Sequence, residues 1–255
     1  MIKKFKHYLK ILGPIKLIEY ILLEVQMLVM RIFKTSFSQR GEDIIIDNLL
    51  GKKRGGFYVD IGAYDPTRFS NTKRFYLRGW RGINIEPDPI RIKKFHNSRP
   101  RDINLNIGIA NKNGLLNFFK FSPQTLSTFS KSAAANYQKQ GYTIIETLKV
   151  KVSKLGQILE KECKNRQIDF FSIDTEGSDL EVLKSNNWKK FKPKVICIEG
   201  QGNNPEKLLT KLGYKKVYTT QTNAIFSLAF VSMRGKRLYP NQTFSPRKLH
   251  FSDTP

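Results

Sequence analysis

Short apolar runs that end in an acidic residue recur along this chain. Four of them cover residues 57–60, 82–86, 169–174 and 195–199. Segments with helical periodicity lie between the runs, so strands and helices alternate. This alternation predicts an α/β fold, with a mostly parallel sheet covered by helices on both faces.

The rest of the pattern supplies further elements. Helices are expected at 38–50, 71–78, 90–96, 155–163, 179–183 and 205–212. Additional strands are expected at 104–110, 115–121, 147–152, 215–219 and 224–231. The strand at 115–121 should be an antiparallel excursion, and the last two strands should form an antiparallel hairpin. The segment 123–141 is polar and has no clear period, so we expect a loop or lid over the ligand site.

The first 36 residues have a different pattern from the rest. A lysine-rich start precedes Gly13-Pro14, which should break a first helix, and residues 15–33 read as a second, mostly apolar helix. Glu19 and Glu24 make a membrane span costly, and no signal-peptide cleavage site follows. Two alternatives remain for residues 1–34: an interfacial membrane anchor, or a helix packed on the globular domain or on a second subunit.

We therefore expect an N-terminal extension at 1–36, one globular domain at 37–232 and a basic tail at 233–255. The formal net charge of +24 can attract nucleic acid, anionic lipid or an acidic substrate, or can be a solvated surface. No Arg-Gly tract or RNP-like motif accompanies the charge. Cys163 and Cys197 fit neither a metal spacing nor a disulfide framework, which favours a reducing compartment.

Acidic residues at the ends of neighbouring strands predict a ligand site, because ligands of an open parallel sheet bind outside the carboxyl ends of its strands. Asp60-Ile61-Gly62 is a strand-to-turn junction, and Gly62 permits a tight turn close to a ligand. Glu86 ends the next strand, where an acid usually holds ribose hydroxyls. A single Gly does not make a diphosphate cradle, so an adenosine without phosphates fits better. The alternative is that either acid is a helix cap or a turn residue.

Several stretches between residues 37 and 230 resemble the FkbM family of S-adenosylmethionine-dependent methyltransferases. They are SQRGED at 38–43, FYVDIGA at 57–63, GWRGINIEP at 79–87, IDFFSIDTEGSDLEVL at 168–183 and PKVICIE at 193–199. The resemblance implies a Rossmann-like class I methyltransferase fold, a seven-stranded sheet and S-adenosylmethionine as cofactor. It implies cofactor contacts from Asp60, Gly62 and Glu86. The predicted cofactor site also includes Ala63, Pro87 and Asn106.

Asp174 and Glu176 should lie at the same end of the sheet, and either carboxylate can accept the proton of an acceptor hydroxyl. Glu199 ends the next strand and faces the same crevice, so these three residues form the predicted catalytic set. The three carboxylates can instead hold Mg²⁺. We favour a metal-free base, since no His or Asn completes a ligand shell. Alternatively, Glu176 or Asp179 only caps the following helix.

These residues and the resemblance together predict a methyltransferase that O-methylates a glycan, a lipid-linked saccharide or a related metabolite. The alternatives are an RNA-modifying or RNA-binding protein, motivated by the charge alone, and a fold that binds cofactor without catalysis. A saccharide acceptor is the expected partner, and nucleic acid is not. We expect a cytoplasmic protein, with peripheral contact at the inner face of the membrane as the alternative suggested by residues 1–34.

Overall fold

The computed structural model describes residues 36–164, 166–199 and 203–228, together with seven helical positions between 14 and 29. Much of the predicted helix at 15–33, the end of the predicted strand at 224–231 and the whole tail at 233–255 lie outside the described residues. Within the described part of the chain, no helix combines the length and the apolar content needed to cross a bilayer.

A seven-stranded sheet with the strand order β3-β2-β1-β7-β8-β10-β9 forms the centre of the molecule. The first five strands in this order run parallel, and β10 runs antiparallel to both of its neighbours. The predicted parallel sheet and its antiparallel C-terminal strands are therefore confirmed. The strands are β1 (Phe57–Ile61), β2 (Arg81–Ile85), β3 (Ile103–Leu105), β7 (Phe170–Ile173), β8 (Val195–Glu199), β9 (Lys215–Thr219) and β10 (Asn223–Ser227).

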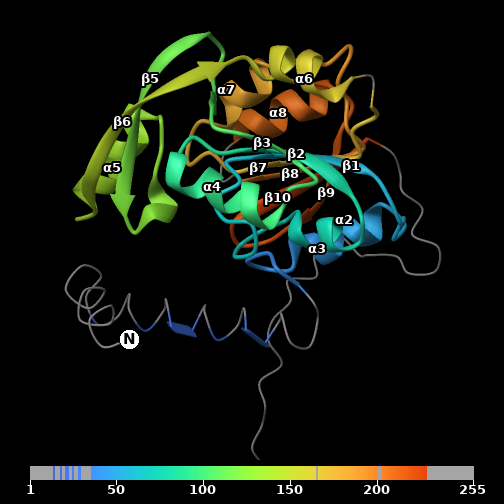
Figure 1. Ribbon diagram of the computed structural model, residues 1–255, viewed down its shortest axis with the longest axis horizontal. Coiled ribbons are helices and arrows are strands. Elements are labelled where there is room, and N and C mark those ends of the chain that lie inside the picture. The colour runs from blue at the N-terminus through green and yellow to red at the C-terminus, as the bar shows by residue number, and fades with distance from the viewer. Residues whose placement is uncertain are drawn as a thin grey trace, which may run out of the picture.

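Helices cover both faces of this sheet (Figure 1). One face packs against α6 (Leu155–Cys163), α7 (Asp179–Lys184) and α8 (Asn203–Lys211). The other packs against α2 (Glu42–Leu49) and α3 (Lys73–Leu77), while α4 (Pro89–Ser98) joins β2 to β3. Side chains of a strand alternate between the faces, so the apolar runs read from the sequence reflect burial on both sides.

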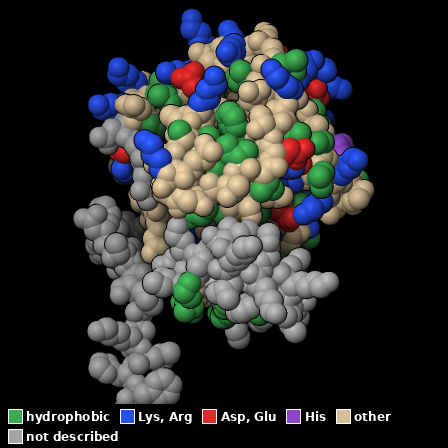
Figure 2. Space-filling view, turned by 90° about the vertical axis from the view of Figure 1, so that its left-hand side faces the viewer, with side chains coloured by type: hydrophobic (Ala, Val, Ile, Leu, Met, Phe, Trp, Pro, Cys, Tyr) green, Lys and Arg blue, Asp and Glu red, His purple; other side chains and the backbone are tan. Residues whose placement is uncertain are grey.

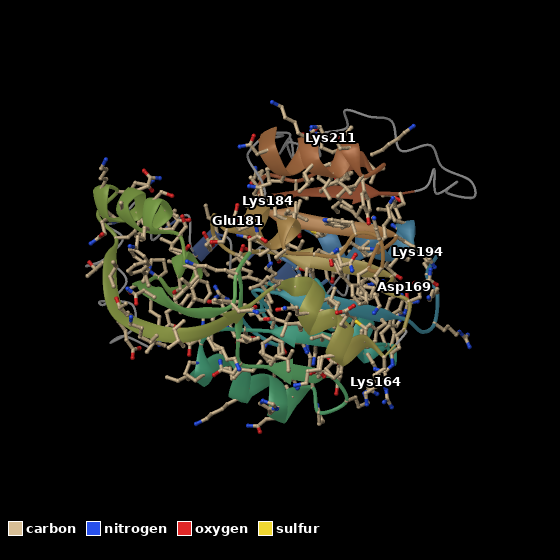
Figure 3. All side chains as sticks on the ribbon, turned by 90° about the horizontal axis from the view of Figure 1, so that it is seen from above. Lys164, Asp169, Glu181, Lys184, Lys194 and Lys211 are labelled. Carbon is tan, nitrogen blue, oxygen red and sulfur yellow. The ribbon has the colours of Figure 1, made fainter. Side chains whose placement is uncertain are left out.

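A second sheet, with the order β4-β6-β5, projects from the first. It contains β4 (Gly108–Ile109), β5 (Gly114–Ser122) and β6 (Thr143–Ser153), with β5 and β6 antiparallel as expected for an excursion. Between these two strands lie η1 (Gln124–Leu126) and α5 (Lys131–Lys139). Seen from above, β5 and β6 curve away from the central sheet and carry α5 at their far end (Figure 3). We call residues 114–153 the lid.

Two local predictions were wrong. The single strand expected at 104–110 is two strands, β3 and β4, which belong to different sheets. Between them the exposed Asn106 donates its side-chain amide to the carbonyl oxygens of Glu86 (3.0 Å) and Pro87 (2.9 Å), where a regular strand would continue. The segment expected as a loop at 123–141 contains α5, whose first turn is capped by Ser130 accepting from the Ala133 N–H (3.2 Å).

The SQRGED stretch ties the start of the domain to its end. Gly41 has a left-handed φ of 87°, so residues 38–41 turn and α2 begins only at Glu42. The buried carboxylate of Glu42 accepts hydrogen bonds from Thr220 Oγ1 (2.9 Å) and Asn223 Nδ2 (3.0 Å). These two hydrogen bonds help to hold Asn223 at the carboxyl end of β8, where it pairs with Glu199.

Candidate active site

One cavity of about 1240 Å³ lies outside the carboxyl ends of β1, β2, β7 and β8 and extends to the lid. Eight of the nine predicted site residues line it, so the sheet brings together two groups that are far apart in the sequence. The exception, Asn106, braces the end of β2 as described above. The eight are Asp60, Gly62, Ala63, Glu86, Pro87, Asp174, Glu176 and Glu199.

The turn after β1 packs directly on the segment after β7. Gly62 has a φ of +77°, and a Cβ atom there would lie 1.8 Å from the carbonyl oxygen of Asp174. Only glycine fits this approach. The N–H groups of Gly62 and Ala63 both donate to the carbonyl oxygen of Ile85, at 3.0 and 3.1 Å, which fixes the turn against β2 as well.

Asp60 is almost completely buried beneath this turn. Its carboxylate accepts a 2.6 Å hydrogen bond from Thr72 Oγ1, and Thr72 in turn accepts one from the fully buried Arg99 (2.7 Å). Burial raises the pKa of Asp60 to about 6, against the effects of Thr72 and Arg99. Asp60 therefore braces the loop that surrounds the cavity in addition to forming part of its wall.

Glu86 presents a fixed carboxylate to the cavity. It is only 3% exposed, and its two oxygens accept hydrogen bonds from the backbone N–H groups of Tyr64 (2.8 Å) and Asp88 (2.9 Å). Burial raises its pKa to about 7. A carboxylate has about four acceptor positions, so each oxygen can accept one more hydrogen bond.

This half of the cavity has the chemistry that S-adenosylmethionine requires. Glu86 can accept from two ribose hydroxyls, and Ile107 and Ile109 line the same cavity and supply apolar walls for a purine ring. The cofactor carries a sulfonium and an ammonium cation, and Asp60 lines the same space. In a chain with a net charge of +24, the carboxylate of Asp60 provides local negative charge that favours a cationic ligand.

A compact carboxyl cluster forms the other half of the site. One oxygen from each of Asp174, Glu176 and Glu199 lies within 4.8 Å of the others, and Asp174 and Glu199 share a hydrogen bond. Burial, followed by repulsion between the carboxylates, raises the pKa of Glu176 and of Glu199 to about 8. Burial, followed by repulsion from Glu199, also raises the pKa of Asp174 well above its usual range. The side chain of Asp174 is open to the cavity, but protein atoms crowd its carboxyl group.

The loop at 174–177 holds the cluster in an uncommon backbone conformation. Glu176 and Gly177 have left-handed φ values of 50° and 90°. Asp179 accepts from both the N–H (3.0 Å) and the hydroxyl (2.9 Å) of Thr175, so it stabilises this loop. It is not the helix cap considered as an alternative from the sequence, because Ser178 occupies the N-cap position of α7 and no side chain caps that helix. Glu176 does not follow that alternative, because its carboxylate is aimed at the lid.

Tyr137 of α5 reaches this loop from the lid and was not identified from the sequence. Its hydroxyl donates a 2.6 Å hydrogen bond to Glu176 Oε2, and Thr128 Oγ1 donates one of 2.7 Å to the carbonyl oxygen of Glu176. A Cβ at Gly177 would lie 3.2 Å from Ala133, which shows how closely α5 packs on the loop. The lid therefore fixes both the backbone and the carboxylate of Glu176.

Two cations connect the lid to the region around α4. Lys120, only 5% exposed, pairs with Asp88 (3.1 Å) and with Glu146 (2.8 Å). Arg91 donates to the carbonyl oxygen of Gln124 at 3.0 Å. One signal in the sequence could have identified Lys120: it interrupts the apolar run at 118–121, and a lysine inside a buried strand needs a carboxylate partner.

Structural similarity to solved proteins is distant. The chain matches the methyltransferase domain of METTL16 with 14% identity and a TM-score of 0.41, covering 73% of this chain and 66% of that domain. It matches the C-terminal domain of precorrin-6Y C5,15-methyltransferase from Rhodobacter capsulatus with 15% identity and a TM-score of 0.34, covering 72% and 84%. A putative caffeoyl-CoA O-methyltransferase from Staphylococcus aureus matches with 10% identity and a TM-score of 0.38, covering 80% and 90%. At these values the likenesses identify no substrate.

Sequence comparison gives the family. No curated protein matches the chain. The family model of the methyltransferase FkbM domain matches residues 60–226, which is more than half of the chain and spans the sheet from the end of β1 to β10. That range contains all nine predicted site residues and the lid. Together with the sheet order and the antiparallel β10, the match shows that this chain belongs to the FkbM family of methyltransferases.

Proposed function

We propose that this methyltransferase uses S-adenosylmethionine to O-methylate a hydroxyl group of a glycan, a lipid-linked saccharide or a related metabolite. The observation that carries the proposal is the arrangement of the cavity. Its Gly62–Glu86 half fits the cofactor, and its other half holds carboxyl groups with raised pKa values within reach of the same space.

The residues of the chain have separate roles in this reaction. When bound, S-adenosylmethionine supplies an electrophilic methyl group. A carboxylate of the cluster at Asp174, Glu176 and Glu199 accepts the proton of the acceptor hydroxyl as its oxygen attacks. Tyr137 orients Glu176, and the cavity walls hold the acceptor oxygen in line, which supplies much of the rate in a displacement of this kind.

The lid half of the cavity supports a polyhydroxylated acceptor. Hydroxyl and amide side chains of the lid face it, and so do the rings of Phe118, Phe129 and Tyr137, which offer flat apolar surfaces to a sugar. The polar residues are Ser122, Gln124, Thr125, Ser127 and Thr143.

A nucleic-acid acceptor fits this cavity less well. The carboxyl cluster would repel a phosphodiester next to the reacting oxygen once it ionises. On the face seen in Figure 2, the Lys and Arg side chains are spread around the edge and do not form a continuous stripe. Lys53 and Lys194 lie at the opposite end of the sheet from the cavity, where both pair with the buried Asp169 just before β7. Figure 3 shows Asp169 and Lys194 near each other.

The deciding experiment is transfer of a labelled methyl group from S-adenosylmethionine to candidate acceptors. We expect labelling of saccharides and lipid-linked saccharides, but not of RNA. Activity that persists in a chelator supports a carboxylate base without metal. Loss of activity in the chelator, with recovery on adding Mg²⁺, would instead assign the cluster to a cation. Labelling of RNA alone would reject the proposed acceptor class.

Replacing Glu86 by Ala should weaken S-adenosylmethionine binding by about 1–3 kcal/mol, because charge-assisted hydrogen bonds to the ribose are lost. Calorimetric titration of the folded variant measures this. Glu206→Ala removes the same charge from an exposed site, where Glu206 pairs with Lys216, and should leave the affinity unchanged. Equal affinity in the wild type and the Glu86 variant would remove this residue from the cofactor site.

Turnover should rise with pH through about 8, since a base is active only when ionised and Glu176 and Glu199 have pKa values near 8. The hydrogen bond from Tyr137 favours the ionised form of Glu176, so Tyr137→Phe should raise the pKa of Glu176 and move the rising limb to higher pH. Rate profiles at saturating cofactor test this. Tyr214→Phe loses a hydrogen bond to the Pro193 carbonyl oxygen instead, and its profile should not move.

A further inference from the structure

The helical positions described near the N-terminus carry exposed aliphatic side chains. Six of them, between positions 18 and 29, are 42–62% exposed. Each of these positions is three residues or one residue after the previous one. Positions three and four residues apart lie on the same side of a helix, so these six share one side. The six are Ile18, Ile21, Leu22, Val25, Leu28 and Val29, and we call them the aliphatic face.

This face differs from the rest of the described surface. Eleven large apolar side chains are exposed among the described residues, and six of them belong to the aliphatic face. The other five are single residues on α3, α4, β5, β6 and β9. Scattered apolar residues are normal on a protein surface, whereas a contiguous set marks a contact with something else. The described part of the domain offers no similar patch that could cover it.

The positive charge of the chain favours an anionic partner for the aliphatic face. Lysines at positions 3, 4, 6, 10 and 16 lie next to the aliphatic face in the sequence, and the whole chain has a net charge of +24. Two such chains repel each other, while an anionic surface attracts them. An apolar helix face next to basic residues is the pattern of helices that lie in a membrane interface.

We propose that the aliphatic face docks on an anionic lipid surface, with its side chains in the acyl boundary, and that the positive charge of the chain strengthens this contact. This docking does not depend on the acceptor proposed above, although it would bring the enzyme to a lipid-linked acceptor. It requires no helix to cross the membrane.

Sedimentation of the full chain with vesicles tests the proposal. We expect binding to vesicles that contain phosphatidylglycerol, a decrease as NaCl is raised, and weak binding to pure phosphatidylcholine. The double variant Leu22→Glu with Leu28→Glu should bind at least about tenfold more weakly, because two apolar contacts are lost and two carboxylates face anionic headgroups.

A matched control is available on the catalytic domain. Leu77 and Leu115 are 58% and 65% exposed, similar to Leu22 at 62% and Leu28 at 56%, so Leu77→Glu with Leu115→Glu makes the same chemical change elsewhere. This control should bind vesicles like the wild type, and cofactor titration and thermal unfolding should show that both variants are folded.

Three results would overturn the proposal. The first is a full chain that does not sediment with anionic vesicles. The second is an equal loss of binding in the two double variants, or a loss in neither. The third is a dimer in light scattering that becomes a monomer only in the Leu22 and Leu28 variant, without vesicle binding; this result would assign the aliphatic face to a second copy of the chain.

Discussion

Replacing Gly62 by Ala should destabilise the protein by more than about 4 kcal/mol and abolish cofactor binding. The methyl group would lie 1.8 Å from the carbonyl oxygen of Asp174, and the backbone, with φ at +77°, would have to move. Both the turn after β1 and the start of the loop at 174–177 would shift. Chemical denaturation measures the loss of stability, and calorimetry at low temperature measures cofactor affinity.

The control for this prediction is Gly51→Ala. Gly51 has a similar φ of +68°, but a Cβ atom at this position would have no other atom within 4 Å, so only the conformational cost of about 1 kcal/mol should remain. The difference in unfolding free energy between the two variants therefore measures the close approach of Gly62 to the carbonyl oxygen of Asp174. Equal destabilisation in both would mean that the contact with Asp174 has no special role.

Replacing Glu176 by Gln, or Asp174 by Asn, should lower turnover by ~10²–10⁴-fold in at least one of the two variants. The amides keep the shape of the side chains but cannot accept the proton of the acceptor hydroxyl. Cofactor affinity should stay nearly unchanged, since the residues that fit the ribose lie around Glu86. The measurement is methyl transfer at saturating cofactor, with calorimetry alongside.

Glu181→Gln provides the matched control, because Glu181 lies on the neighbouring α7, is about half exposed and pairs with Lys184 (Figure 3). It should retain full activity. If both Asp174→Asn and Glu176→Gln were fully active, the carboxylate base would be excluded and positioning would remain as the main source of rate. If both were inactive and the wild type required Mg²⁺, the cluster would be a cation site.

The central sheet could be predicted from local patterns. A strand buried on both faces must be apolar at nearly every position, and β1, β7 and β8 show this in five or fewer residues each. An acid at or next to the last residue of each of these strands marks its carboxyl end. Parallel pairing then brings Asp60, Glu86 and Asp174 to one edge without further information, which is why eight predicted residues line one cavity.

The lid was only partly predictable. Its polar composition suggested a cover over the site, but not α5, because the helix is short and depends on its Ser130 cap and on packing against Gly177. The break between β3 and β4 was also missed. It depends on Asn106 bonding to the backbone at the end of β2, about twenty residues earlier in the chain.

The sequence by itself determined the fold class, the succession of the central strands and helices along the chain, and the acids at the strand ends. These features are local, because a strand buried on both faces is apolar along its length and an acid marks the end of that run. The tertiary structure decided what each acid contacts. Tyr137 reaches Glu176 across 39 residues, and Glu42 reaches Asn223 across 181. Such contacts depend on how β5, β6 and the C-terminal hairpin pack in space, and no local periodicity encodes them. The raised pKa values of the carboxyl cluster likewise arise only when folding buries these groups side by side.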